Sequence, residues 1–247
     1  MRGLQGWQGT GPESAEEMIA EARKAFFVMF AFMSVVWALQ IANWMGHYRI
    51  DAEYQIIPQQ VDRLPDIFAA PFLHYSWAHI EGNSGPLFVF GFLAAYRGVI
   101  RFLWLTLLVA VTSGLAVWSF QDTHTASVGA SGLIFGYFGY VVVRGIFDRH
   151  LIDTLIGLVM AASFAYLVTI ALPGTPGVSW LAHMGGFVGG VLGAWLLRDR
   201  RPTVPVAAGP ASGAAVGAAS GTALVPGPAA GAGREDLHKE LGDLGLL

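Results

Sequence analysis

Ser131 is the first residue whose surroundings suggest chemistry. It lies between small residues, in Gly129-Ala130-Ser131-Gly132, near the start of a stretch from Ala126 to Val143 that carries no charge. A serine becomes a nucleophile when a base accepts its proton and hydrogen-bond donors stabilise the oxyanion that forms. His183 is the candidate base. Taken alone, a serine in a membrane helix is more often a packing residue that bonds back to a carbonyl one turn earlier.

His79 and Asn83 are the candidate donors for the oxyanion. They are four residues apart, so on a helix they share one face. No Asp or Glu is obviously placed to orient His183. Phe135 lies one turn after Ser131 on the same face and offers a ring on which the imidazole can pack. Serine–histidine chemistry without a carboxylate is a variant of the catalytic triad.

Glycine spacing predicts that the helices carrying Ser131 and His183 come close together. Gly132, Gly136 and Gly139 fall at spacings of four and three, which places them on one helix face. A second set of glycines follows the candidate base His183 and comprises Gly185, Gly186, Gly189, Gly190 and Gly193. Because glycine has no side chain, it lets another membrane helix approach closely.

The composition is that of a membrane protein. The 247 residues are 54% hydrophobic and 13% charged, with a mean hydropathy of +0.54, whereas soluble proteins carry about 25% charge. We therefore expect the lipid bilayer as a partner. The net charge of −3 argues against a nucleic-acid partner. The chain has no cysteine, which excludes thiolate metal sites and cysteine nucleophiles, and we predict neither a metal nor a cofactor.

Hydropathy predicts an all-α polytopic fold with six transmembrane helices. The expected spans are residues 26–44, 79–96, 102–120, 126–143, 155–172 and 178–197. They form a membrane domain over residues 25–198, preceded by an N-terminal segment 1–24 in which Pro12 to Glu17 starts a short helix. A tail rich in Ala, Gly and Pro, residues 199–247, cannot bury a core. Residues 45–72 are expected to be a partly buried loop at the membrane interface.

The distribution of Lys and Arg predicts the orientation. With six spans, only Arg49 and Arg63 fall on the face opposite the termini, and all other loop cations fall on the same face as the termini. The positive-inside rule then places both termini in the cytoplasm of a multi-pass protein of the plasma membrane. In that arrangement His79, Asn83, Ser131 and His183 all lie in the outer leaflet, so the site would open to the extracellular side.

Three separated motifs resemble those of the rhomboid intramembrane serine proteases. The fourth span matches with Gly129-Ala130-Ser131-Gly132 followed by Gly139-Tyr140 and Arg144-Gly145. The second matches with Phe72-Leu73-His74 and His79-Ile80 with Asn83, and the sixth with Ala182-His183 followed by Gly186 and Gly190. The resemblance covers roughly residues 25 to 198.

The resemblance implies a dyad of Ser131 and His183, with His79, Asn83 and the Ser131 backbone amide stabilising the oxyanion. It implies a structural role for His74, and supporting positions at Gly129, Gly132 and Phe135. Substrates would be single-span membrane proteins, cut in or just above the membrane near small, helix-breaking residues. Water would reach the site from the outer face.

Other functions remain open from the sequence. A catalytically inactive relative that binds membrane helices is the first alternative, and a transporter with a broken second span is another. A metal site built from His74, His79 and His183 is possible on count alone. The chain lacks the H-E-x-x-H spacing of zinc proteases, which disfavours a metalloprotease. The spans contain no paired aspartates, which disfavours an aspartyl protease.

Overall fold

The fold is that of a computed structural model, which describes residues 14–170, 173–174 and 177–199. Within these ranges the chain is helical, apart from one isolated antiparallel bridge between Ile56 and Ser127, so the all-α prediction is confirmed. The predicted tail, from residue 200 on, lies outside the described residues. The helices are α1 (Ala15–Met45), α2 (Arg49–Tyr54), η1 (Val61–Phe68), η2 (Ala70–Phe72), α3 (Trp77–Ala95), α4 (Val99–Phe120), α5 (Ser131–Asp148), α6 (Leu151–Ser163), α7 (Tyr166–Ile170) and α8 (Trp180–Leu196).

The first helix is longer than predicted. Ser14 caps it by accepting a hydrogen bond from the Glu17 amide at 3.2 Å, and acidic residues follow in the first turn, where the helix dipole favours them. The separate short helix expected near Pro12 to Glu17 is wrong, because Ala15 to Glu17 form the first turn of α1. No Gly or Pro interrupts the chain between Ala15 and Met45.

The predicted fourth span begins too early. The helix starts at Ser131 rather than at Ala126, and it ends at Asp148. Ser127 exchanges two backbone hydrogen bonds with Ile56, and the Gly129 amide donates to the Ala70 carbonyl at 2.9 Å. These bonds hold residues 127–129, directly before the helix, in a non-helical conformation. Ser131 is therefore the first residue of α5 instead of lying inside a helix.

The predicted fifth span is also wrong as one continuous helix. The chain forms α6 and α7, which are separated at Phe164 and Ala165. Phe164 leaves the helical conformation, and its ring packs edge-on against the buried Phe90 of α3, with centroids 4.8 Å apart. The second, third and sixth predicted spans match α3, α4 and α8 with shifts of only a few residues at their ends.

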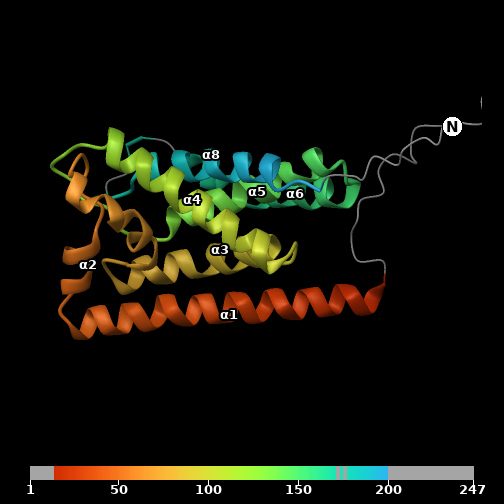
Figure 1. Ribbon diagram of the computed structural model, residues 1–247, viewed down its shortest axis with the longest axis horizontal. Helices are drawn as coiled ribbons and strands as arrows, with labels where there is room; N and C mark the ends of the chain where they lie inside the picture. Colours follow the sequence, from red (N-terminus) through yellow and green to blue (C-terminus); the bar gives the residue numbers. More distant parts are fainter. Residues whose placement is uncertain (1–13, 171–172, 175–176, 200–247) are drawn as a thin grey trace, which may run out of the picture. The chain divides into compact units, whose positions relative to one another are not determined.

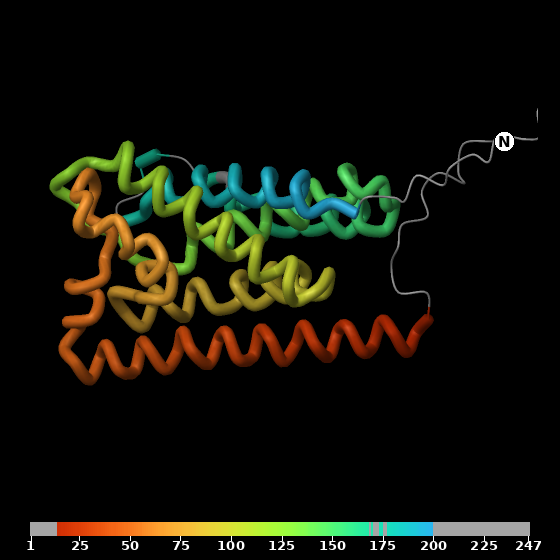
Figure 2. Tube along the Cα trace, viewed as in Figure 1, coloured from red at the N-terminus to blue at the C-terminus, as the bar shows by residue number. Residues whose placement is uncertain are grey.

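The helices pack into a bundle in which α5 is the central member. Every residue from Gly132 to Val141 is buried. Helix α5 packs on α3, α6 and α8, while α4 packs on α8 and α1 packs on α3 (Figure 1). The start of α1 and the end of α8 lie at one end of the bundle. Figure 2 shows the connection from α1 to α3 gathered at the other end, where α5 begins.

The connection between α1 and α3 is partly buried, as predicted, but it is not a simple loop. It contains α2, η1 and η2, and it buries Asp51, Ile56, Ile67 and Ala70. Its backbone bonds to Ser127 and Gly129 tie it to the segment that leads into α5. This connection therefore forms part of the support beneath Ser131.

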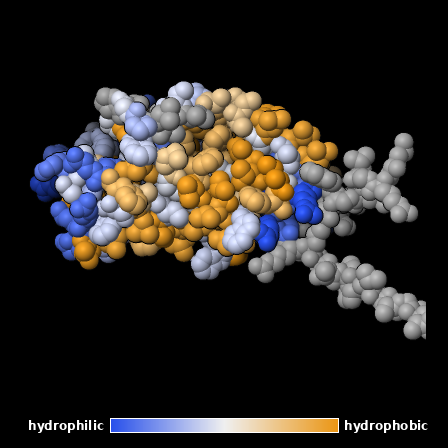
Figure 3. Space-filling model, turned by 90° about the horizontal axis from the view of Figure 1, so that it is seen from above, coloured by the Kyte–Doolittle hydropathy of each residue, from blue (hydrophilic) through white to orange (hydrophobic). Residues whose placement is uncertain are grey.

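The outward faces of the helices are apolar. By length and composition, α1 and α4 could each cross a membrane, and α6 and α8 are shorter apolar helices. Large apolar side chains are exposed on several helices, among them Phe27, Phe30, Trp104, Leu158 and Trp195. Figure 3 shows a hydrophobic band with hydrophilic residues at both ends of that face. Length and composition thus identify two of the six predicted spans.

Candidate active site

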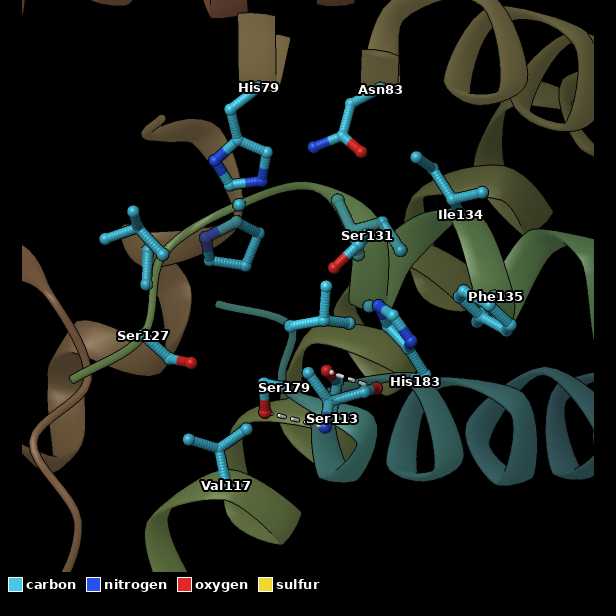
Figure 4. A pocket seen from close by; sticks show the side chains of 18 of the residues that line it. His79, Asn83, Ser113, Val117, Ser127, Ser131, Ile134, Phe135, Ser179 and His183 are labelled. Atoms are coloured by element: carbon cyan, nitrogen blue, oxygen red, sulfur yellow. Dashed lines mark hydrogen bonds between the residues drawn. The ribbon is translucent and has the colours of Figure 1, made fainter. Parts of the chain in front are cut away.

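A cavity of about 230 Å³ lies at the end of the bundle where α5 begins. Its walls come from α3, α4, α5, α7 and α8 and from the connection between α1 and α3 (Figure 4). Of the eight predicted site residues, seven line this cavity and one, His74, does not. The seven are His79, Asn83, Gly129, Ser131, Gly132, Phe135 and His183. Residues far apart in the sequence are thus brought to one place.

Ser131 opens the central helix. As the first residue of α5, it lies where backbone N–H groups have no acceptor within the helix and where the helix dipole is positive. Its side chain is partly buried and lies near His183 in the cavity (Figure 4). This position suits a hydroxyl whose attack creates negative charge close to the helix terminus.

His183 is held against an aromatic ring. It lies in the first turn of α8, is 3% exposed, and its imidazole stacks on Phe135 with centroids 4.1 Å apart and an interplanar angle of 16°. The ring contact predicted from the sequence is therefore confirmed. The described residues that line the cavity include no Asp, Glu, Lys or Arg.

The glycines of α5 and α8 lie in direct contact, which confirms the predicted close approach of the two helices. A Cβ atom built on Gly186 would collide with the Gly132 carbonyl oxygen, and one built on Gly190 would collide with that of Gly136. Backbone therefore packs on backbone at these points. Any larger residue would push α8 away from α5 and would move His183 away from Ser131.

His79 and Asn83 face Gly129, which lies two residues before Ser131. Gly129 has a φ of +129°, a conformation that favours glycine. A Cβ built there would lie 2.8 Å from His79 Nε2 and 3.8 Å from Asn83 Nδ2. Asn83 Nδ2 is buried and has no acceptor among the described residues. Nitrogen atoms of His79 and Asn83 thus lie beside Gly129 in the cavity wall.

His74 lies behind His79 rather than in the cavity. The two rings meet edge to face with centroids 4.9 Å apart, and His74 is completely buried. Burial, and then the neighbouring His79, lower the pKa of His74 to about 3, so its ring stays neutral. No group of three or more residues able to bind a metal occurs in the described ranges, so the three-histidine metal site gains no geometric support.

Three polar residues near the dyad were missed by the sequence analysis. Ser113 of α4 donates to the Ala182 carbonyl at 2.9 Å, and Gln121, at the end of α4, accepts from Ser179 at 2.5 Å. Ser179 caps α8, the helix that carries His183. The one available signal was the presence of hydroxyl and amide side chains within or next to otherwise apolar helices.

Comparisons with known proteins find one family model and several relatives. A family model described as Rhomboid domain matches residues 60–200. The chain is 34% identical over 177 residues to an uncharacterized protein of Mycobacterium tuberculosis, a match that covers 68% of this chain and 73% of that protein. A similar protein of Mycobacterium leprae is 33% identical over 68% of this chain and 70% of its own length. Rhomboid-like protein 11, chloroplastic, of Arabidopsis thaliana is 32% identical over 52% of this chain and 50% of its own length.

Proposed function

The chain belongs to the rhomboid family and is a membrane protein, and on that premise we propose that it is an intramembrane serine endopeptidase. The observation that carries the proposal is that Ser131, His183, His79 and Asn83 line one cavity. The substrates would be membrane proteins with a single span, cleaved in or near that span. No cofactor is needed for this chemistry.

In the proposed reaction, His183 accepts the proton of the Ser131 hydroxyl as Oγ attacks the scissile carbonyl carbon. His79, Asn83 and the Ser131 backbone amide donate hydrogen bonds to the oxyanion. His183 then gives its proton to the leaving amine, and water hydrolyses the acyl-enzyme by the same route. The stacking of His183 on Phe135 and the unpartnered Asn83 Nδ2 support these roles.

The membrane arrangement that fits this reaction has six crossings, with α6 and α7 together forming the fifth. Both termini would be cytoplasmic, the cavity would open to the extracellular side of the plasma membrane, and residues 25–198 would form the membrane domain. The cationic residues Arg97, Arg101 and Arg144 take part in ion pairs near the ends of α3 to α6 and α8, which supports a cytoplasmic position for that end.

Cleavage of a single-span substrate by the purified protein in detergent tests the function. Ser131→Ala and His183→Ala should each lower turnover by roughly a thousandfold or more, because nucleophile and base act as one unit. Ser84→Ala is the matched control, since Ser84 Oγ donates to the Ile80 carbonyl within α3, outside the cavity. It should retain wild-type turnover, and a metal chelator should change none of the rates.

One outcome would contradict the proposed protease function. If wild type and Ser131→Ala showed the same residual cleavage, the protease would be excluded. The alternative would then be a catalytically inactive relative that binds membrane helices. Photo-crosslinking of the same single-span substrate to both proteins in liposomes would identify that activity, since binding would not need the serine hydroxyl.

A further inference from the structure

The side chain of Gln121 joins two segments that are distant in the sequence. Its Oε1 accepts a hydrogen bond from Ser179 Oγ at 2.5 Å, and its Nε2 donates to Thr125 Oγ1 at 2.9 Å and lies 3.5 Å from Ser127 Oγ. An amide has one acceptor oxygen and two N–H donors. Both ends of the Gln121 amide are therefore occupied, and its orientation is set by its partners.

The two segments are those that carry the proposed dyad. Ser179 is the N-cap of α8 and accepts from the Ala182 amide at 3.2 Å, directly before His183. Thr125 and Ser127 belong to the extended segment that leads into Ser131. One side chain at the end of α4 therefore connects the start of the histidine helix with the approach to the serine helix.

Ser113 makes a second connection from the same helix. Its hydroxyl donates to the Ala182 carbonyl, and it packs against Gly132, where an added Cβ would collide with Ser113 Oγ. Ser113 and Gln121 are eight residues apart, which is about two helical turns, so they lie on the same face of α4. Helix α4 thus holds the first turn of α8 at two points, one through its cap and one through a carbonyl group.

We propose that Gln121 is a positioning residue for the Ser131–His183 pair, an inference that rests on the proposed function. It touches neither side chain of the pair and acts through Ser179 and through the segment that contains Thr125. Its hydrogen bonds to Ser179 and Thr125 contribute to the relative placement of the two helix ends. A misplacement of about 1 Å can cost about a hundredfold in rate.

Gln121→Met tests this proposal, because methionine keeps the length of the side chain and makes no comparable hydrogen bond. We expect kcat to fall by roughly 10- to 100-fold with KM changed by less than about threefold. Trp118→Phe is the matched control. It also removes one hydrogen bond at this end of α4, from Trp118 Nε1 to the Gln60 carbonyl at 2.9 Å, but this bond leads away from the dyad. Its kcat should stay within about threefold of wild type.

A conservative variant separates positioning from loss of packing. Ser179→Thr keeps a hydroxyl that can cap α8 and donate to Gln121, so its kcat should be close to that of wild type. Ser179→Ala loses both bonds, and its kcat should fall as in Gln121→Met. The rate at which a fluorophosphonate phosphonylates Ser131, with loss of fluoride as Oγ attacks phosphorus, should fall by the same factor, since that rate reports the geometry of the nucleophile and its base without binding of the protein substrate.

All rates are measured at a temperature at which thermal unfolding shows every variant to be folded. If kcat and the phosphonylation rate of Gln121→Met equalled those of wild type, the inference would be overturned and the protease function would stay intact. A fall in kcat of Gln121→Met that is fully explained by the fraction of unfolded variant would overturn the inference as well. A wild-type protein that neither cleaves the substrate nor is phosphonylated at Ser131 would instead contradict the proposed function, which makes the two failures distinguishable.

Discussion

At the scale of single residues, the ring contact between His183 and Phe135 is a direct geometric feature of the proposed base. The imidazole and the Phe135 ring are nearly parallel, and both are buried. Such ring pairs contribute about 0.5–1.5 kcal/mol beyond the burial of their area. The orientation of the proposed base therefore depends on a weak interaction that a single substitution can remove.

Phe135→Leu should lower kcat by roughly 2- to 10-fold, because it removes that ring contact from His183. Phe135→Tyr keeps the ring and serves as the matched control, with kcat expected close to wild type. Steady-state cleavage of the single-span substrate measures both. Equal activity in Phe135→Leu and wild type would show that the stacking does not orient the base.

His74 should make stability depend on pH. Its pKa is about 3 in the folded protein, because burial disfavours the charged ring, and 6.5 is its ordinary value. Between these values the unfolded chain binds more protons, so the free energy of unfolding falls as the pH drops from about 6.5 towards 3. The full contribution is present above pH 6.5 and amounts to a few kcal/mol at most, at about 1.4 kcal/mol per pKa unit.

Denaturant unfolding in detergent at pH 7 and pH 4.5 measures this effect. His74→Phe should reduce the difference between the two pH values, whereas His124→Phe, at an exposed position, should leave it unchanged. The same pH dependence in His74→Phe and wild type would mean that other groups cause the acid sensitivity.

At the scale of helices, α5 and α8 are held together by backbone contacts between glycines. Gly186→Ala should destabilise the protein by about 1–3 kcal/mol and lower kcat, because its methyl group would collide with the Gly132 carbonyl. Gly85→Ala is the matched control on α3, where an added Cβ meets nothing within 4 Å. It should be neutral or stabilising by up to about 1 kcal/mol, since alanine is the better helix former.

Thermal unfolding and substrate cleavage together check the glycine prediction. The expected order of stability is Gly85→Ala at or above wild type, and Gly186→Ala below it. If Gly186→Ala unfolded at the same temperature as wild type, α8 could move away from α5 without a loss of stability. The close helix contact would then not be needed to hold the dyad.

At the scale of the whole molecule, ion pairs centred on the buried Arg144 and Asp148 join several helices at the end of the bundle away from the cavity. Arg144 of α5 is 3% exposed and donates from Nε to Asp148 at 2.6 Å. Arg97 pairs with Asp153 of α6, and Arg101 pairs with Asp199 at 2.6 Å. Asp148 also accepts from the Asp199 amide at 2.9 Å. The network therefore connects α4, α5 and α6 with the end of α8.

Asp148→Ala should destabilise the protein by about 3–5 kcal/mol, because it leaves the buried Arg144 without its nearest carboxylate. Glu21→Ala, which breaks the solvent-exposed pair with Lys24, should cost less than about 1 kcal/mol. Denaturant unfolding compares the two variants. Cleavage per folded molecule should stay at wild-type level in Asp148→Ala, since the cavity lies at the other end of the bundle, and a similar small cost in both variants would contradict the prediction.

The sequence by itself determined the helical class, the approximate place of most helices and seven of the residues that line the cavity. Apolar stretches and glycine spacing are local features, and they predict helices and close contacts wherever the helices meet. The pairing of His183 with Phe135 followed from a one-turn spacing in α5 together with the absence of a nearby carboxylate.

Only the tertiary structure decided where helices begin and break. Ser131 became the first residue of α5 because Ile56 and Ala70, far away in the sequence, bond to the segment before it. The fifth segment is broken where Phe164 packs on Phe90. Gln121 and Ser179 are 58 residues apart, and no local pattern relates them. Hydrogen bonds and ring contacts between distant segments compete with local helix formation, so a local pattern cannot predict their outcome.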